Sequence, residues 1–272
     1  MIVITGATGN VGRPLVRALT EAGEQVTAVT RSITDAPAGV RRHQVDLAEP
    51  ESLKPALDGA KAIFLLTSGD FVARGNLTDV VRVVQGAGVE RIVLLSSQGV
   101  GTQRHPSNLE DAVVQSGLEW TLLRPGNFSS NAFQWAESVR AERLVSAPFG
   151  DVALPAVDPD DIAEVAAVAL REPGHAGARY TLTGPAAVSP RDQAAAIGAA
   201  LGESVRFVEL SRTQARNRML GYMPEQVAES TLDILGTPYA AEQQVTPDVE
   251  KVLGRPARTF ADWATRNVAA FR

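Results

Sequence analysis

The feature that most constrains this chain is its opening sequence, MIVITGATGNVG, at residues 1–12. The β-branched run Ile2–Ile4 predicts a strand, and three evenly spaced glycines follow it, Gly6, Gly9 and Gly12. The next residues place apolar side chains at a spacing near 3.6, which predicts a helix. A strand, a glycine-rich turn and a helix in this order are typical of a site that holds a dinucleotide pyrophosphate.

The three glycines meet different steric demands. Gly6 permits a tight turn out of the strand, and Gly9 has no side chain to keep the backbone away from a pyrophosphate. Gly12 allows the helix to lie close against the strand. The free N–H groups and the positive dipole at the start of the helix attract phosphate, so the sequence predicts a dinucleotide-binding turn.

Strand and helix patterns continue at regular intervals after this turn. Residues that favour strands occur in five further runs: Gln25–Thr30, Arg41–Val45, Ala62–Leu66, Arg91–Leu95 and Glu119–Leu123. Helical patterns lie between several of them: Glu51–Leu57, Leu77–Gln85 and Leu109–Gln115. Strands that alternate with helices predict an α/β fold with a Rossmann-type, doubly wound parallel sheet.

The alternation weakens beyond residue 127. Strand patterns then occur at Tyr180–Thr183 and Arg206–Leu210, and helical patterns at Phe128–Arg140, Asp160–Leu170, Arg191–Leu201 and Pro224–Leu235. A final helix is expected to carry Phe260, Trp263 and Val268. We expect an NAD(P)-binding Rossmann domain over residues 1–155, to which residues 156–183 return. Residues 184–272 are expected to form a smaller C-terminal α+β region on the substrate side.

The composition excludes several classes of function. The net charge of -5 gives no general attraction to nucleic acid or to an anionic membrane. No apolar run reaches the roughly 18 residues that a membrane span needs, and the first strand begins too early to leave room for a signal peptide. The chain has no cysteine, and its three histidines lack metal-ligand spacing, so we expect no metal site. These features favour a cytoplasmic protein.

The end of the second strand distinguishes NAD from NADP. An NAD site usually has an acidic residue there, which binds the ribose 2′-hydroxyl, but this strand ends in Thr30 and Arg31. A planar guanidinium suits a 2′-phosphate, so Arg31 favours NADP, with NADPH preferred over NADH. The alternative is a solvated loop cation. At the end of the third strand, Asp46 is expected to accept a hydrogen bond from the adenine amino group or to cap its own loop.

Four motifs together resemble one known family: GATGNVG at 6–12, VDL at 45–47, LLSS at 94–97 and WTLLRPGNF at 120–128. They are similar to the NmrA-like atypical short-chain dehydrogenase/reductases, and most of all to the NADPH-dependent quinone reductase and triphenylmethane reductase branches. The resemblance is strong over roughly residues 1–135 and looser over 157–163 and 180–185.

The resemblance implies a set of residues around the cofactor. The phosphate loop would comprise Gly6, Thr8, Gly9, Asn10, Val11 and Gly12. Arg31 would contact the 2′-phosphate, and Asp46 and Leu47 the adenine. Two further groups would lie beside the ribose and near the nicotinamide: Leu66, Thr67 and Ser68, and then Pro125, Gly126 and Asn127.

The catalytic pair of typical short-chain dehydrogenases is absent. That pair is Tyr-x-x-x-Lys, whose spacing puts both side chains on one face of a helix. None of the three tyrosines, Tyr180, Tyr222 and Tyr239, is followed by a lysine four residues later. The helix expected to carry the pair runs through residues 105–110. There Asn108 stands where some relatives have a lysine, and an asparagine cannot act as an acid at neutral pH.

One function that fits these features is that of an NADPH-dependent oxidoreductase. It would transfer hydride to a quinone-like or conjugated carbonyl small molecule, whose stabilised anionic product needs no strong proton donor. Catalysis would then consist mostly of positioning the acceptor. The resemblance places Ser97 near the family's serine position, which implies that it binds the carbonyl oxygen. His105 is expected to deliver a proton, because an imidazole titrates near neutral pH. The structural alternatives are a strand-end serine and a surface histidine.

The other function is that of a non-catalytic, NADP-binding redox sensor of the NmrA type. An apolar cleft lined by Phe128, Phe133, Trp135 and Phe149 would favour the enzyme, whereas packing of these rings in a core would not. Under either function we expect a monomer or a homodimer. The enzyme would take a small-molecule substrate, and neither function involves nucleic acid or a membrane.

Overall fold

The structure, a computed structural model, describes residues 1–31, 39–67, 71 and 75–272. The chain passes repeatedly between two compact units, which are described separately below. The first comprises Met1–Pro125, Pro159–Leu182 and Asp248–Arg255; the second comprises Gly126–Asp158, Thr183–Pro247 and Pro256–Arg272. The domain boundaries expected near residues 155 and 183 stay a prediction, because compact packing does not show which parts fold or act alone.

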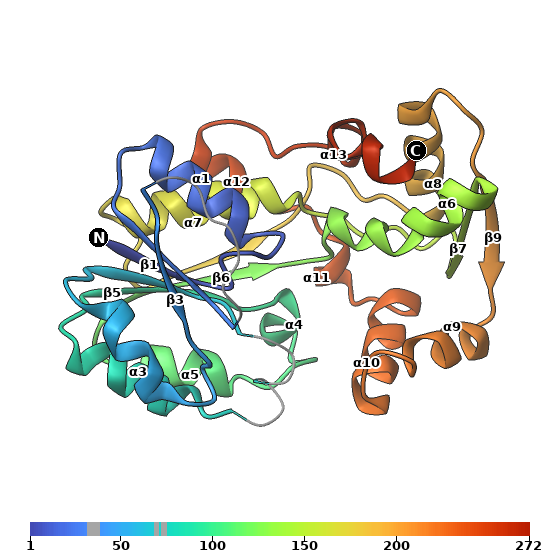
Figure 1. The fold of residues 1–272 in the computed structure, drawn as a ribbon. Coiled ribbons are helices and arrows are strands. Elements are labelled where there is room, and N and C mark those ends of the chain that lie inside the picture. Colours follow the sequence, from blue (N-terminus) through green and yellow to red (C-terminus); the bar gives the residue numbers. More distant parts are fainter. Residues whose placement is uncertain (32–38, 68–70, 72–74) are drawn as a thin grey trace. The chain divides into compact units, whose positions relative to one another are not determined.

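Within the described residues, the first unit is built on a seven-stranded parallel sheet with the order β3-β2-β1-β4-β5-β6-β8 (Figure 1). Its strands are β1 (Ile2–Thr5), β2 (Val26–Thr30), β3 (Arg41–Gln44), β4 (Ala62–Leu65), β5 (Arg91–Leu95), β6 (Glu119–Pro125) and β8 (Ala178–Leu182). The strand order runs outward from β1 in both directions, which is the doubly wound Rossmann arrangement. The predicted fold class is therefore confirmed, and the predicted strands of this sheet are found with ends shifted by at most two residues.

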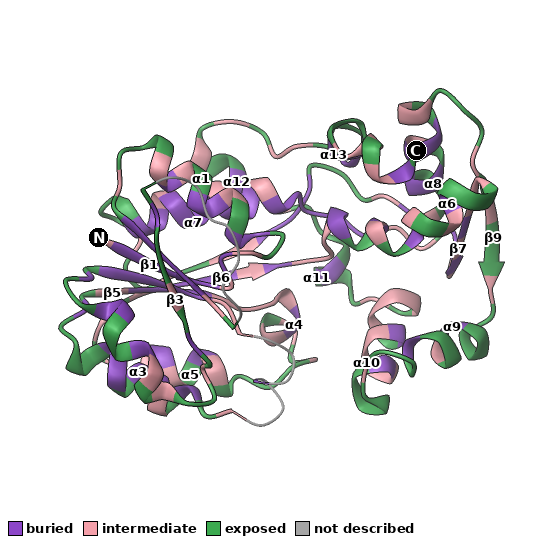
Figure 2. Ribbon diagram, viewed as in Figure 1, coloured by how far each residue is buried: buried purple, intermediate pink, exposed green. Residues whose placement is uncertain are grey.

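Helices cover both faces of this sheet, which explains why its central strands are almost wholly apolar. Every residue of β1 and β4 is buried, as expected for a parallel sheet between two helical layers (Figure 2). One face carries α1 (Gly12–Glu21), α7 (Pro159–Arg171) and α12 (Asp248–Leu253), and the other carries α3 (Leu77–Gly86) and α5 (Asn108–Val114) (Figure 1). The edge strand β3 is polar and mostly exposed, which discourages pairing with another chain.

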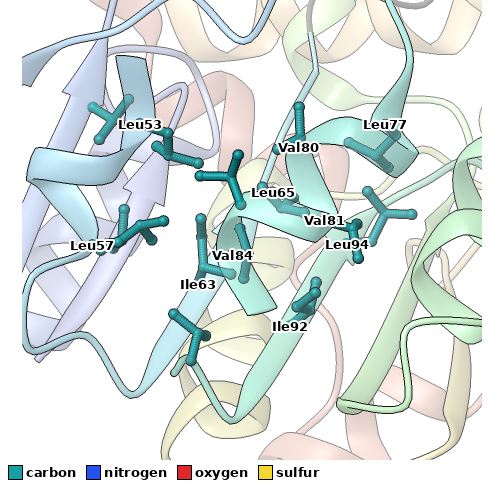
Figure 3. Packing of buried hydrophobic residues seen from close by; sticks show 14 of the residues in the cluster. Leu53, Leu57, Ile63, Leu65, Leu77, Val80, Val81, Val84, Ile92 and Leu94 are labelled. Atoms are coloured by element: carbon teal, nitrogen blue, oxygen red, sulfur yellow. The ribbon is translucent and has the colours of Figure 1, made fainter. Parts of the chain in front are cut away.

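An apolar cluster fills the space between the sheet and α3 (Figure 3). It joins buried side chains of β4, β5, α3 and the 3₁₀ helix η1 (Pro50–Leu57): Leu53, Leu57, Ile63, Leu65, Val80, Val84, Ile92 and Leu94. Burial of each such side chain contributes roughly 1.5–3 kcal/mol. The predicted helix at this position takes the 3₁₀ form, and Pro55 inside it lacks the N–H that an α-helix would use.

The second unit contains a two-stranded parallel sheet of β7 (Leu144–Pro148) and β9 (Arg206–Leu210). Its helices are η2 (Ser129–Trp135), α6 (Ala136–Glu142), α8 (Pro190–Leu201), α9 (Arg212–Met219), α10 (Glu225–Gly236), α11 (Ala240–Gln243), α13 (Phe260–Arg266) and η3 (Val268–Phe271). The single helix expected over Phe128–Arg140 is thus two helices, η2 and α6. Strand β7 and helix α9 have no counterpart among the predicted elements. No helix in the described part of the chain is long and apolar enough to cross a membrane.

Two kinds of contact hold the second unit together. Aromatic rings form one core, in which Phe133 meets Trp263 edge-on at a centroid distance of 4.9 Å and stacks on Phe271 at 6.2 Å. Ion pairs join α9 to α10, since Arg212 donates to Glu229 at 2.7 Å and Arg216 donates to the same carboxylate at 2.5 Å. Arg212 and Arg216 of α9 are therefore engaged within the unit.

The turn between β1 and α1 depends on a close approach of two backbone segments. Gly6 has a φ of +64°, which residues with a side chain rarely adopt. A Cβ atom on Gly12 would lie 2.0 Å from the carbonyl oxygen of Gly6 and 2.7 Å from Cα of Ala7. Both distances are far inside van der Waals contact. The steric roles predicted for Gly6 and Gly12 are therefore observed.

The substitution Gly12→Ala tests this approach. It is expected to lower the free energy of unfolding by about 2 kcal/mol or more, because backbone atoms must shift to admit the methyl group. The matched control is Gly86→Ala in α3, where the new Cβ would meet no described atom within 4 Å other than its chain neighbours and the backbone of its own helix. This control should stabilise the protein slightly, by up to about 1 kcal/mol. Urea unfolding measures both, and equal effects would contradict the proposed clash.

Candidate functional site

The candidate cofactor residues of the first unit gather at one edge of its sheet. All strands of the sheet are parallel, so their carboxyl ends share that edge, where open α/β sheets bind ligands. Gly6 follows β1, Arg31 follows β2 and Leu66 follows β4, while Asp46 comes soon after β3. Positions far apart in the sequence are therefore brought to neighbouring strand ends.

A buried hydroxyl joins the phosphate loop to the end of β4. The Oγ1 atom of Thr5 accepts a hydrogen bond from the Leu66 N–H at 2.7 Å and lies 3.1 Å from the carbonyl oxygen of Phe64, within donating distance. The Cβ position of Gly6 is 2.9 Å from Cδ2 of Leu66, so the two segments touch. Thr5 was not among the predicted site residues. Its signal in the sequence was a polar residue that ends an otherwise apolar strand.

The phosphate loop presents its backbone outward at Gly9 and Asn10. Both residues are exposed, whereas Thr8 is half-buried and Val11 is buried together with Gly12. The N–H of Gly9 donates to the carbonyl oxygen of Gly6 at 3.0 Å, and the carbonyl oxygen of Gly9 accepts from the N–H of Arg13 at 3.1 Å. The loop is therefore held by its own backbone while one side of it faces outward.

The ends of β2 and β3 place Arg31 and Asp46 close together. The N–H of Val45 donates to the carbonyl oxygen of Thr30 at 2.9 Å, so the residues that follow these strands are neighbours, and both Arg31 and Asp46 are exposed. Oδ1 of Asp46 accepts from the N–H of Ala48 at 2.9 Å, which is the loop-capping role. An adenine contact of Asp46 or of the half-buried Leu47 stays a prediction.

The remaining predicted cofactor residues lie at the ends of β4 and β6. Leu66 and Thr67 are half-buried, and Ser68 lies outside the described residues. Pro125 is the buried last residue of β6, and the chain then enters the second unit at Gly126. There the amide oxygen of Asn127 accepts from Nδ2 of Asn131 at 2.8 Å.

The two candidate catalytic residues are in direct contact. Ser97 is the second residue after β5, and the short helix α4 (Gln98–Gly101) follows it at once. Oγ of Ser97 lies 2.8 Å from Nδ1 of His105. The helix expected over residues 105–110 begins only at Asn108, so His105 lies in the turn between α4 and α5. That turn is what carries the imidazole back to the end of β5.

A buried ion pair that was not predicted lies beside this serine. Glu110 of α5 is buried, and its carboxylate accepts hydrogen bonds from Oγ of Ser96 at 2.5 Å and from Nε and Nη2 of Arg124 at 2.9 and 2.5 Å. Burial raises the pKa of Glu110, but the hydrogen bonds from Arg124 and Ser96 outweigh it, so its pKa lies below the ordinary value of 4.5. The hydrogen bond from Arg124 to Glu110 raises the pKa of Arg124 in turn. The network ties α5 to the ends of β5 and β6.

The aromatic residues after β6 pack in cores of the second unit. Phe133 and Trp135 belong to the cluster that surrounds Trp263, and Phe149 packs against the buried residues of α9 and α10. For these three rings, core packing is the interpretation that the contacts support. Phe128 is half-buried.

The buried pair gives a test of stability against pH. Arg124→Met is expected to lower the free energy of unfolding at pH 7 by about 3 kcal/mol, because Glu110 is left buried without its cation. Since the folded pKa of Glu110 is lowered, the contribution of the pair is present above pH 4.5 and lost as the pH falls through the folded pKa. The difference in the free energy of unfolding between wild type and Arg124→Met should therefore become smaller as the pH falls below 4.5. The control Lys61→Met removes an exposed pair with Glu90, which water and salt screen, and should leave the free energy of unfolding close to wild type both at pH 7 and in acid.

Comparison with known proteins agrees with this geometry. Residues 6–173 match the NAD(P)H-binding family. The chain is 36% identical to a (4-alkanoyl-5-oxo-2,5-dihydrofuran-3-yl)methyl phosphate reductase of Streptomyces griseus subsp. griseus. It is 35% identical to an NAD(P)H azoreductase of Xenophilus azovorans. Both alignments cover all of this chain and 99% of the relative. The structure of an NADPH-dependent quinone oxidoreductase of Escherichia coli, complexed with NADPH, superposes with a TM-score of 0.81 at 25% identity, over 98% of this chain and 99% of that one.

These matches confirm that the chain is similar to NAD(P)H-binding reductases and to the quinone reductase branch that the motifs indicated. The structure of NmrA, at 21% identity, shows the same fold. The family match begins at Gly6, the first glycine of the loop, and covers strands β2 to β6, whose carboxyl ends contribute to the candidate site. The chain therefore belongs to the NAD(P)H-binding family and, within it, to the NAD(P)H-dependent oxidoreductases.

Proposed function

We propose that this protein is an NADPH-dependent reductase that transfers hydride to a quinone-like or conjugated carbonyl small molecule, without a Tyr-x-x-x-Lys pair. The observation that carries the proposal is the placement of the Ser97 hydroxyl. It lies at the same strand edge as the glycine loop and Arg31. A hydrogen-bond donor and a cofactor site at one edge are what such a reduction requires.

The loop fits a dinucleotide pyrophosphate. Gly9 is exposed, and among the described atoms only the carbonyl oxygen of Gly6, at 3.4 Å, comes within 4 Å of the place where its Cβ would be. A phosphate can therefore approach the backbone there, next to the start of α1. Arg31 is proposed to hold the 2′-phosphate, because a guanidinium matches its geometry and charge and no acid ends β2.

In the proposed reaction the chain positions the acceptor and binds its oxygen. NADPH supplies the hydride. The Ser97 hydroxyl donates a hydrogen bond to the acceptor oxygen, on which negative charge grows as the hydride arrives. A quinone or a conjugated carbonyl spreads that charge over its own π-system, so a weak donor is sufficient.

The names of the relatives support this substrate class. The Streptomyces relative is named for reducing an alkanoyl-substituted oxodihydrofuran, a ring whose name specifies carbonyl groups on an unsaturated system. The Xenophilus relative is named for reducing azo compounds. Both names describe acceptors that contain a double bond, and the Streptomyces name specifies carbonyl groups on an unsaturated ring. Because Phe133, Trp135 and Phe149 pack in cores, they do not give the enzyme the support that an apolar cleft would have given. The sensor function is therefore one outcome of the test below.

The first test is NADPH oxidation against a panel of quinones, conjugated enones and simple aldehydes. Turnover on the order of 1–10³ s⁻¹ is expected with at least one conjugated acceptor, and slower turnover with isolated aldehydes, which give a less stable anion. Loss of NADPH absorbance measures the rate, and product analysis shows which bond was reduced. Tight NADPH binding without turnover on any acceptor would contradict the proposal and favour the sensor.

The second test is the substitution Arg31→Glu. It is expected to raise the KM for NADPH on the order of 100-fold, the equivalent of losing about 2.7 kcal/mol, because a carboxylate repels the 2′-phosphate. The KM for NADH should change less than about 3-fold. The control Arg41→Glu makes the same charge change at the amino end of β3, away from the carboxyl ends that form the candidate site. It should leave the KM for NADPH and the KM for NADH close to wild type. Equal losses for the two cofactors would show that Arg31 does not select NADPH.

A further inference from the structure

Ser97 occupies a helix cap but does not use its hydroxyl for capping. It is the N-cap residue of α4, with φ -147° and ψ 155°, and its side chain makes no capping hydrogen bond. A serine at this position ordinarily accepts from a backbone N–H of the first turn. Here Oγ lies 2.8 Å from Nδ1 of His105 instead. The hydroxyl is therefore committed to the imidazole rather than to the helix.

The backbone is shaped to hold that imidazole in place. The N–H of His105 donates to the carbonyl oxygen of Gly99 at 2.9 Å, and the N–H of Arg104 donates to the same oxygen at 2.8 Å. A Cβ on Gly99 would lie 2.5 Å from Nδ1 of His105. The ring thus lies directly against a position where any side chain would displace it. Its residue is exposed, so the ring can exchange protons with water.

We infer that Ser97 and His105 form a proton-delivery pair that takes the place of the absent Tyr-x-x-x-Lys pair; this inference rests on the reductase function proposed above. Ser97 is the catalytic residue, because its hydroxyl touches the acceptor oxygen. His105 is a positioning residue, which orients that hydroxyl and restores its proton.

The proton transfers balance as follows. Hydride adds to the acceptor, its double bond opens, and the electron pair moves to the acceptor oxygen. The Oγ–H bond of Ser97 breaks as its proton goes to that oxygen, and Nδ1–H of the protonated His105 gives its proton to Oγ. His105 is left neutral and regains a proton from water. The sum is one hydride and one proton added to the acceptor.

Two classes of acceptor allow proton delivery by this pair to be tested separately from hydride transfer. A quinone or an enone needs a proton as well as a hydride. A cationic triarylmethyl dye becomes a neutral molecule when it takes the hydride alone, so it needs no proton. A proton-delivery pair should therefore matter for the first class far more than for the second, whereas damage to the fold or to cofactor binding should affect both alike.

The experiment compares kcat for a quinone or enone with kcat for the dye in Ser97→Ala and His105→Gln. Each variant is expected to lower the ratio of the two kcat values by about 100-fold, the lower range for general acid catalysis. Ser97→Thr, which keeps the hydroxyl on an extended backbone, should restore much of the ratio. The control Ser107→Ala removes an exposed hydroxyl of the same turn, which donates to Asp111, and should leave the ratio near wild type.

Gly99→Ala keeps both side chains but places a methyl group where the imidazole lies. It should lower the same ratio, while Gly86→Ala, which meets no described atom within 4 Å other than its chain neighbours and the backbone of its own helix, should not. A readout without turnover is the nitrogen NMR signal of His105, one of three histidines in the chain. Ser97→Ala and Gly99→Ala should each shift its Nδ1 resonance in the resting protein.

The outcomes distinguish the two proposals. If the wild type reduces both acceptor classes and the variants lower both rates equally, or if the His105 resonance does not move, the proton-delivery pair is overturned and the reductase function stands. If the wild type reduces the dye alone, the pair is overturned and the carbonyl substrate class with it. If the wild type reduces neither, the reductase function itself fails.

Discussion

The close approach of Gly12 to the carbonyl oxygen of Gly6 is the contact on which the candidate site of the first unit depends. A Cβ on Gly12 would lie 2.0 Å from that oxygen, so only glycine lets α1 begin directly beside the end of β1. The position of α1 brings the free N–H groups of its first turn to the edge where the other strands end. Helix α7 packs against α1 in the same layer. One backbone contact at the first turn therefore aligns the loop, a helical layer and the strand edge.

Buried polar groups then hold the strand ends in register. The Thr5 hydroxyl binds the backbone of β4, and Glu110 binds Ser96 after β5 and Arg124 near the end of β6. Each group has its hydrogen-bond partners, so burial does not leave it unsatisfied. Such satisfied contacts stiffen the rim of the sheet, and a stiff rim is what a site needs to hold an acceptor within a fraction of an ångström. Ser97 lies directly after Ser96 on this rim.

Much of the fold could be predicted because the patterns are local. Ten residues or fewer are enough to predict the apolar strands β1 and β5 and the amphipathic helix α3. A parallel sheet covered on both faces requires continuous apolar runs in its strands, and a helix covering it requires an apolar stripe. Strand β7 could not be predicted in this way, because it is five residues long, ends in Pro148 and pairs with β9 some sixty residues later. Helix α9 is nearly all polar and is held by ion pairs to α10, which periodicity does not detect. Likewise, the bond from Ser97 to His105 depends on how one turn folds back.

By itself the sequence determined the Rossmann-type sheet, the glycine turn and the absence of a Tyr-x-x-x-Lys pair, because each follows from residue type and spacing along the chain. It also predicted which residues follow the strands, and because the strands are parallel these residues lie at one edge of the sheet. Only the tertiary structure decided which of these side chains touch. It joined Ser97 to His105, buried Glu110 against Arg124 and placed Phe133 and Trp135 in a core. The physical reason is that hydrogen bonds and packing depend on distances of a few ångströms, which the spacing of residues along the chain does not determine.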